Sequence, residues 1–173
     1  FKNTSVTKGY KNSVLAIGNF DGVHVGHKKV LNAAYKKAKE IKKKFGLLTF
    51  EPVPVMFFNK KIINHRLDTL PQKISNLKNK KLDFVIIQKF NRRFSKLSYQ
   101  DFIYKVLHKE IKCKYLYVSK NFKFGNKREG DIRKLKKFEK IYLFKTVITS
   151  PIKKKSKTVS STIIRNLLKK GDI

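Results

Sequence analysis

Two hydrophobic patterns alternate along this chain. Short runs of consecutive apolar residues, such as residues 13–20, predict buried strands. Between these runs, apolar residues recur every three or four positions, as they do on one face of a helix. In the first helical segment, which starts near Gly26, lysines occupy the opposite face. Its apolar stripe consists of Val30, Leu31, Ala34, Ala38, Ile41 and Phe45. We expect Gly46 to end this helix, because glycine readily adopts the left-handed conformation that closes one.

The same two patterns continue to the end of the chain. Pro52 and Pro54 favour an extended loop. Strands that alternate with helices imply right-handed crossovers, so we predict an α/β fold: a Rossmann-like, doubly wound, mainly parallel sheet with helices on both faces. Ligands of such sheets bind at the carboxyl ends of the strands. Further strands are predicted over residues 47–50, 83–90 and 141–150, and a strand with its loop over residues 115–124. Helices are predicted over residues 67–82, 99–111, 131–140 and 160–170.

Length and charge add two expectations. The 173 residues predict a single domain, residues 1–173, with one core. The net charge of +32 comes from 43 basic and 11 acidic residues, but only six of the basic residues are arginines. Specific nucleic-acid binders cluster arginine and lysine on one face, whereas here lysine is spread along the whole chain. We therefore expect non-specific binding of polyanions at low salt, and no specific nucleic-acid partner.

Other features bear on the cellular compartment. Cys113 is the only cysteine, so neither an internal disulfide nor a zinc site built from cysteines is possible. No apolar run is long enough to span a membrane, and no signal peptide is visible. The chain begins at Phe1 without an initiator methionine, which suggests a trimmed sequence. We expect a cytoplasmic location and no membrane association.

The residues best suited to chemistry follow the first strand. His24 and His27 straddle Gly26 at the predicted start of a helix. A helix N-terminus offers unpaired N–H groups and partial positive charge, which suit a triphosphate, and glycine lets backbone approach phosphate closely. Both histidines can donate hydrogen bonds to oxygens that gain charge as pyrophosphate leaves. The alternatives are helix capping or zinc binding, but His65 and His108 have no spacing that completes a zinc site.

A second phosphate-type helix start lies near the end of the chain. Ser160 or Ser161 can cap the last helix, and Arg165, one turn later, can clamp phosphate oxygens with two hydrogen bonds. By itself this segment would fit an ordinary surface helix. Together with the two histidines, it predicts two helix N-termini that converge on one ATP.

Five blocks of the chain resemble those of one family, in the same order. Residues 18–27 resemble the H-x-G-H signature of the nucleotidylyltransferase superfamily, in the form typical of bacterial FAD synthetase modules. Residues 160–165 resemble the second signature, S-S-T-x-I-R. The downstream L-x-x-G-D element of that signature is matched by Leu168, Gly171 and Asp172. The flavin-side segment and two further blocks are matched by residues 118–125, 90–98 and 50–54. In this family the module usually precedes a riboflavin kinase domain, which is absent from these 173 residues.

The resemblance implies an FMN adenylyltransferase, which makes FAD and pyrophosphate from ATP and FMN. It implies that Mg²⁺ bridges the ATP phosphates, without naming a protein ligand for the metal. Asn121 would position the FMN phosphate, and the expected catalytic residues are His24, His27, Asn121 and Arg165. The residues expected to hold ATP are Gly18, Asn19, Phe20, Gly26, Ser160, Ser161 and Thr162, together with the catalytic histidines and Arg165. Aromatic candidates for the flavin slot are Phe57, Phe58, Phe122 and Phe124.

Three positions depart from the family pattern. Val53 replaces the histidine of a P-H-P element, Ser119 stands where glycine is common, and Asn91 where aspartate is common. Val53 removes a hydrogen-bond donor from the flavin side, so we expect this departure to affect the binding of FMN rather than of ATP. The alternatives are an H-x-G-H nucleotidylyltransferase with another phosphorylated acceptor and, in a different class, a basic nucleic-acid-binding module.

Overall fold

A parallel sheet forms the centre of the protein. In this computed structural model, the described residues are 1–59, 61–62, 65–78, 80–150, 153–154 and 157–171. The five strands lie in the order β3-β2-β1-β4-β5, and every pairing between them is parallel. Because β1 pairs with both β2 and β4, the strand order reverses there, which confirms the doubly wound α/β prediction. The strands are β1(Val14–Ile17), β2(Phe45–Glu51), β3(Phe84–Lys89), β4(Tyr115–Ser119) and β5(Lys145–Thr149).

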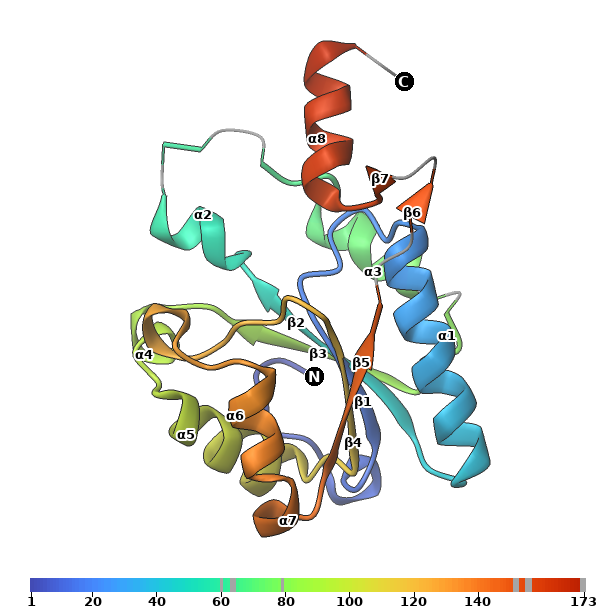
Figure 1. Ribbon diagram of the computed structural model, residues 1–173, viewed down its shortest axis with the longest axis vertical. Helices are drawn as coiled ribbons and strands as arrows, with labels where there is room; N and C mark the ends of the chain where they lie inside the picture. The colour runs from blue at the N-terminus through green and yellow to red at the C-terminus, as the bar shows by residue number, and fades with distance from the viewer. Residues whose placement is uncertain (60, 63–64, 79, 151–152, 155–156, 172–173) are drawn as a thin grey trace.

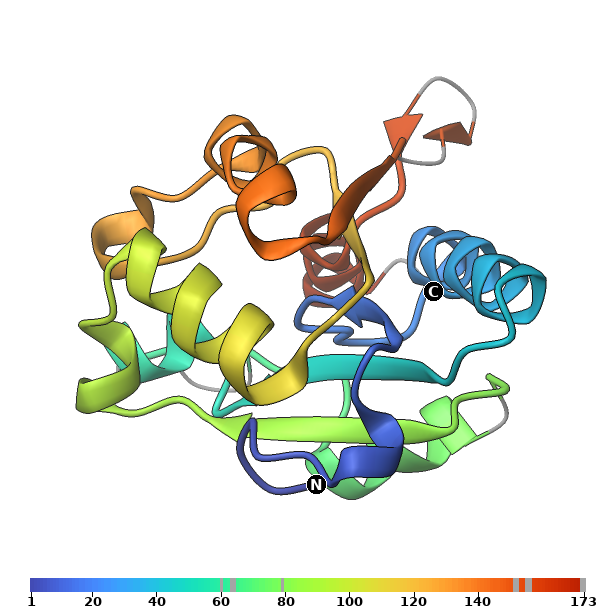
Figure 2. The ribbon, with the colours of Figure 1, turned by 90° about the horizontal axis from the view of Figure 1, so that it is seen from below.

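Helices cover both faces of the sheet, as predicted (Figure 2). Val14 and Ala16 of β1 face α1 and α3 in one apolar cluster, while Leu15 and Ile17 face the opposite cluster around the π-helix η2. Side chains alternate between the faces of a strand, so one buried strand supplies both cores. The helices on the two faces are α1(Val25–Glu40) and α3(Leu70–Lys78) on the first, and α5(Tyr99–Asp101), η2(Phe102–Ile111), α6(Ile132–Lys137) and α7(Glu139–Tyr142) on the second.

The remaining elements lie around the carboxyl end of the sheet or at its periphery (Figure 1). The helix α8(Ser161–Lys170) matches its prediction and extends beyond the sheet. No helix in the described residues is both long and apolar enough to cross a membrane. The other elements are η1(Lys8–Tyr10), α2(Pro54–Phe58), α4(Arg92–Ser95), η3(Asn126–Arg128), β6(Lys153–Lys154) and β7(Lys157–Thr158), of which β6 and β7 form an antiparallel pair.

Several predicted boundaries were wrong. The first helix ends at Glu40, and both Phe45 and Gly46 belong to β2. Phe45 has helical spacing from Ile41, but Lys42 adopts a left-handed φ of 52° and ends the helix earlier. Pro54 begins the short helix α2 where an extended loop was expected, because proline is favoured in the first turn of a helix.

Three further elements are shorter or split. The helix expected over residues 67–82 is α3, which begins only at Leu70, and the helix expected over residues 131–140 is divided between α6 and α7. Residues 141–142 therefore belong to α7, and the last strand of the main sheet starts at Lys145. The Asp172 of the second signature lies outside the described residues.

Gly46 offers a test of the strand assignment. A Cβ at this position would lie 2.1–2.5 Å from ring atoms of the buried Phe84. We therefore expect Gly46→Ala to lower the free energy of unfolding by about 1–3 kcal/mol, the usual cost of overpacking a core. Urea denaturation measures this loss. Gly9→Ala is the control, since a Cβ there meets nothing within 4 Å. Equal stability of the two variants would contradict the tight packing of β2 against β3.

Candidate active site

The loop between β1 and α1 is strained and firmly held. Phe20 and Val23 have left-handed φ angles of 47° and 29°, which are unfavourable for non-glycine residues and especially for a β-branched one. Gly22 also has a left-handed φ, of 77°. The hydroxyl of Thr49 donates a hydrogen bond to the backbone oxygen of Asn19 at 3.0 Å. Strained backbone of this kind collects at functional sites, where the surrounding structure holds it in place.

His24 and His27 lie together at the end of this loop. His24 occupies the N-cap of α1, but its side chain makes no capping hydrogen bond. The two imidazole rings stack with centroids 3.7 Å apart, and the ring of Phe20, buried in the core, lies 5.1 Å from that of His27. A Cβ on Gly26 would lie 3.0 Å from Cε1 of His24, so a glycine at this position leaves room for the His24 ring.

The electrostatics of the pair favour neutral rings. The pKa of His27 is lowered from its ordinary value of 6.5 to about 3, chiefly by burial and also by the neighbouring His24, while Asp21 opposes the shift. Burial lowers the pKa of His24 as well. Nδ1 of both rings is buried without a hydrogen-bond partner in the described structure. Buried nitrogens without partners are costly, which makes this corner suited to a polar ligand.

The second signature meets the first at Asp21. A guanidinium nitrogen of Arg165 lies 3.0 Å from Oδ2 of Asp21, and the Ser161 hydroxyl donates to the Asp21 backbone oxygen at 2.8 Å. Ser160 caps α8 by accepting a hydrogen bond from the Ile163 N–H at 3.3 Å. Thr162 is exposed on the first turn of α8. The structure therefore brings together two helix starts from opposite ends of the chain, as the sequence predicts (Figure 1).

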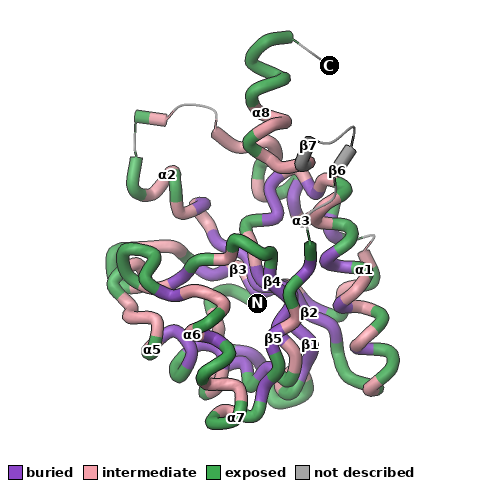
Figure 3. Tube along the Cα trace, in the orientation of Figure 1, coloured by how far each residue is buried: buried purple, intermediate pink, exposed green. Residues whose placement is uncertain are grey.

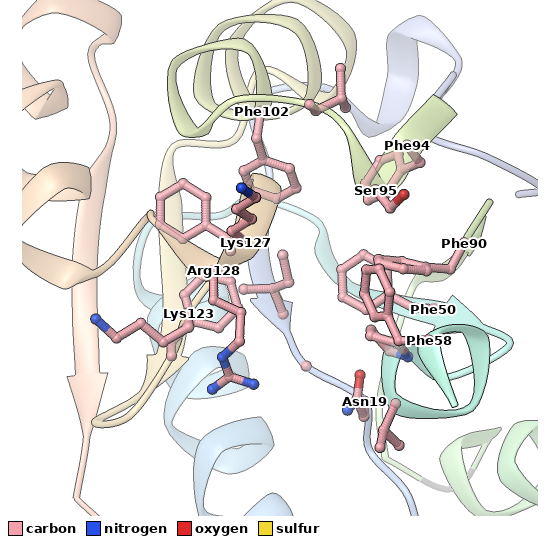
Figure 4. A pocket seen from close by; sticks show the side chains of 18 of the residues that line it. Asn19, Phe50, Phe58, Phe90, Phe94, Ser95, Phe102, Lys123, Lys127 and Arg128 are labelled. Atoms are coloured by element: carbon pink, nitrogen blue, oxygen red, sulfur yellow. The ribbon is translucent and has the colours of Figure 1, made fainter. Parts of the chain in front are cut away.

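A cavity of about 540 Å³ adjoins this corner. Gly18 and Asn19 line it at the end of β1. Figure 4 shows an aromatic wall on one side and basic side chains on the other. The aromatic wall contains Phe50, Phe58, Phe90 and Phe94, and the basic residues are Lys123, Lys127 and Arg128. Such a volume, with mainly apolar walls and a few polar groups, is typical of small-molecule sites.

The predicted flavin residues divide into two groups. Asn121, Phe58, Phe122 and Phe124 all line the cavity. Phe57 does not line it, because this half-buried ring packs against the rings of Phe58 and Phe90, with centroids 5.2 and 5.3 Å away. Val53 is buried at the N-cap of α2 and is also outside the cavity wall.

Sequence reasoning missed two charged residues near the site. Asp21 received no role, although it is 2% exposed and joins the two signatures. Lys73, within the helix predicted over residues 67–82, also received no role and is only 2% exposed. Burial lowers the pKa of Lys73, while the carboxylates of Glu51 and Asp21 oppose this shift. A lysine at a core-facing helical position was the available signal, and the high lysine content concealed it.

The described residues contain no protein-built metal site. No three His, Cys, Asp or Glu side chains among them are grouped so as to hold an ion. The Asp21 carboxylate, the acidic group nearest the histidines in the chain, already accepts from Arg165 and from the backbone N–H groups of Leu67 and Asp68. Among the described residues, His24 and His27 therefore have no third protein ligand with which to hold a zinc ion.

Known proteins with similar sequences share one description. The bifunctional riboflavin kinase/FMN adenylyltransferase of Buchnera aphidicola subsp. Schizaphis graminum is 40% identical over 94% of this chain and 52% of its own length. The protein of the same description from Escherichia coli K12 is 36% identical over 90% of this chain and 50% of its own length. This chain thus spans about half the length of the curated relatives it matches.

The fold is also found among solved structures. A crystal structure described as a macrolide-efflux protein from Streptococcus pneumoniae superimposes with a TM-score of 0.85. It covers 100% of this chain and 57% of its own, but at 20% identity it supports the fold alone. The family model described as FAD synthetase matches residues 6–163, a stretch that includes both histidines and the start of α8. Because this model matches residues 6–163 and the Buchnera relative is 40% identical over 94% of the chain, the chain belongs to the FAD synthetase family.

Proposed function

We propose that this chain is an FMN adenylyltransferase, which transfers the AMP part of ATP to FMN and releases pyrophosphate and FAD. The observation that carries the proposal is the junction at Asp21. There the histidine pair and the start of α8 meet, beside an aromatic cavity that begins at Gly18 and Asn19. The names of the relatives from Buchnera and Escherichia coli support the same activity.

The proposed reaction is an in-line displacement at the α-phosphorus of ATP. An FMN phosphate oxygen forms a bond to that phosphorus while its bond to the bridging oxygen of the leaving group breaks. The electron pair goes to pyrophosphate. The FMN phosphate is already ionised, so no general base is required. Catalysis then consists of positioning the reactants and stabilising the charge that develops on the phosphate oxygens.

Each part of the site has a role in this proposal. His24 and His27 donate hydrogen bonds to phosphate oxygens of ATP, and Arg165 holds the β,γ end. Gly18 and Gly26 let the nucleotide approach the backbone closely, Asn19 contacts it at the end of β1, and Phe20 packs beside the His27 ring. Ser160, Ser161 and Thr162 form the mouth of α8 at the β,γ end.

The acceptor side is proposed to hold the flavin. Asn121 positions the FMN phosphate at the end of the cavity, and Phe58, Phe122 and Phe124 contact the isoalloxazine ring. Aromatic walls suit a flat ring system better than the flexible chain of phosphopantetheine or a sugar phosphate. This favours FMN over the other phosphorylated acceptors.

Magnesium enters the proposal only with the nucleotide. Because the described residues lack a cluster of acidic ligands, we propose that Mg²⁺ is held mainly by the phosphates of ATP and by water. We also propose that the complete protein carries a riboflavin kinase domain, as the names of the relatives suggest, and that it works in the cytoplasm.

An assay with resolved products tests the proposal. These 173 residues, without the proposed riboflavin kinase domain, are incubated with ATP, Mg²⁺ and FMN, and FAD and pyrophosphate are separated and quantified. Riboflavin in place of FMN is the control, because it lacks the phosphate that attacks. Nicotinate mononucleotide and phosphopantetheine test the other acceptors. We expect FAD from FMN alone, and an absence of FAD at every FMN concentration would overturn the proposed function.

A further inference from the structure

The side chain of Asp21 joins three parts of the protein. Its Oδ1 accepts hydrogen bonds from the backbone N–H groups of Leu67 and Asp68, at 2.9 and 3.2 Å. Its Oδ2 accepts from Arg165 of α8 at 3.0 Å. The Asp21 side chain is 3% exposed and that of Arg165 18%, so water screens this ion pair weakly.

Helix α8 has few other polar attachments to the body of the protein. In the described residues, the side-chain hydrogen bonds that join α8 to other elements come from Ser161 and Arg165, and both end on Asp21. Beyond Arg165 the helix is exposed as far as its end, with Leu167 and Leu168 43% and 51% exposed (Figure 3). The placement of Arg165 therefore depends on one carboxylate.

Asp21 also lies within the strained loop that leads to the histidines. Phe20 precedes it, Gly22 and Val23 follow it, and all three have left-handed φ angles. The Gly22 N–H donates to a carboxylate oxygen of Asp68 at 3.0 Å, which adds a second bond from this loop to the same neighbouring segment. Residues 67–68 and the loop thus hold each other in place.

We infer that Asp21 is a positioning residue for nucleotidyl transfer, which fixes Arg165 and the start of α8 against the loop that carries His24 and His27. This inference rests on the proposed function for its kinetic consequences. Its structural basis is the set of hydrogen bonds at the two carboxylate oxygens and the backbone oxygen of Asp21.

The negative charge of Asp21 allows a test, because a charge effect and a positioning role predict opposite changes in ATP binding. A carboxylate beside the proposed phosphate site repels the triphosphate of ATP. If Asp21 acted through charge alone, its neutralisation would strengthen ATP binding. A positioning role predicts weaker ATP binding, because Arg165 loses its hydrogen-bond acceptor and is no longer held in one orientation.

Asp21→Asn isolates the bond to Arg165. The side-chain oxygen of asparagine can keep both hydrogen bonds from Leu67 and Asp68, while its NH₂ group replaces Oδ2 and cannot accept from Arg165. We expect kcat/KM for ATP to fall about 10²-fold, as for other small displacements of reacting groups. The KM for FMN should stay close to its original value. An unchanged or increased kcat/KM for ATP would overturn the inference.

Three further variants make the test specific. Asp83→Asn is the matched control, since Asp83 accepts from the Phe45 N–H and from Lys44 just before β3, at the opposite end of the sheet. It should leave kcat/KM for ATP unchanged. Arg165→Gln should lower it, and adding Asp21→Asn to this variant should cost little more, because both changes remove one interaction. Fully additive losses would show that Asp21 does not act through Arg165.

Hydrogen exchange separates this inference from the proposed function. In Asp21→Asn, amides of residues 161–170 should exchange faster than in the unaltered protein, and in Asp83→Asn they should not. This readout needs no catalytic activity. If the unaltered protein makes no FAD, the proposed function fails, and exchange alone decides the positioning role. If the amides of α8 exchange equally slowly in the unaltered protein and in Asp21→Asn, the positioning role of Asp21 is overturned.

Discussion

Replacement of His27 with alanine is expected to slow FAD formation about 10²–10³-fold, the usual loss when one transition-state hydrogen-bond donor is removed. The proposed role of His27 depends on its place beside His24, where the rings stack 3.7 Å apart at the start of α1. A buried donor needs no reorganisation when charge develops on phosphate oxygens, so its removal should lower kcat as well as kcat/KM. Steady-state kinetics with ATP and FMN measure both.

The controls for this variant concern stability and another histidine. The His27 ring packs 5.1 Å from Phe20, so thermal melting must show that His27→Ala is folded at the assay temperature. His108→Ala removes a ring that stacks on Tyr142 far from both signatures, and it should leave turnover unchanged. Full turnover by a folded His27→Ala would mean that the active site is elsewhere.

The lowered pKa of His27 makes the stability of the protein depend on pH. The folded protein holds this imidazole neutral down to about pH 3, whereas the unfolded chain protonates it near 6.5. Between these values the unfolded state binds more protons, so this residue makes stability fall as the pH decreases. Because kcat/KM reports the free enzyme, it should show no step from His27 between about pH 5 and 8. A step near pH 6.5 that disappears in His27→Ala would contradict the burial of the ring.

The sequence predicted the sheet and the two helix starts because their signals are local. The buried strand that ends at Ile17, the glycine beside His24 and the serine before α8 each act within a few residues. Errors arose where one pattern fits two structures. Phe45 continues a helical stripe and equally suits a buried strand, and only pairing with β1 and β3 decides between them.

Contacts between distant segments could not be predicted in the same way. The aspartate in the first signature gives no indication that it accepts a hydrogen bond from Arg165, 144 residues later. Neighbouring phenylalanines give no indication of which one lines a cavity, because this depends on how α2 packs against β3 and its loop. Phe57 and Phe58 were predicted together, and the structure separates them.

That separation makes a matched pair for testing the acceptor. Phe58 lines the cavity and is 69% exposed, while Phe57 is half-buried behind it. We expect Phe58→Ala to raise the KM for FMN by about 10–100-fold, by analogy with nucleobase stacking on aromatic side chains, which contributes about 1–3 kcal/mol. The KM for ATP should change little, because the proposed ATP site is formed by His24, His27 and the start of α8 and does not include Phe58.

Phe57→Ala should have the reverse effects. This ring packs against Phe58 and Phe90, so its loss should lower the melting temperature more than the loss of the exposed Phe58 does. The KM for FMN should change less than in Phe58→Ala. Equal KM values for FMN in the two variants would show that the cavity is not the flavin slot. Nucleotidyl transfer could then still take place at His24 and His27, with an acceptor held elsewhere, so the pair tests the identity of the acceptor separately from the chemistry.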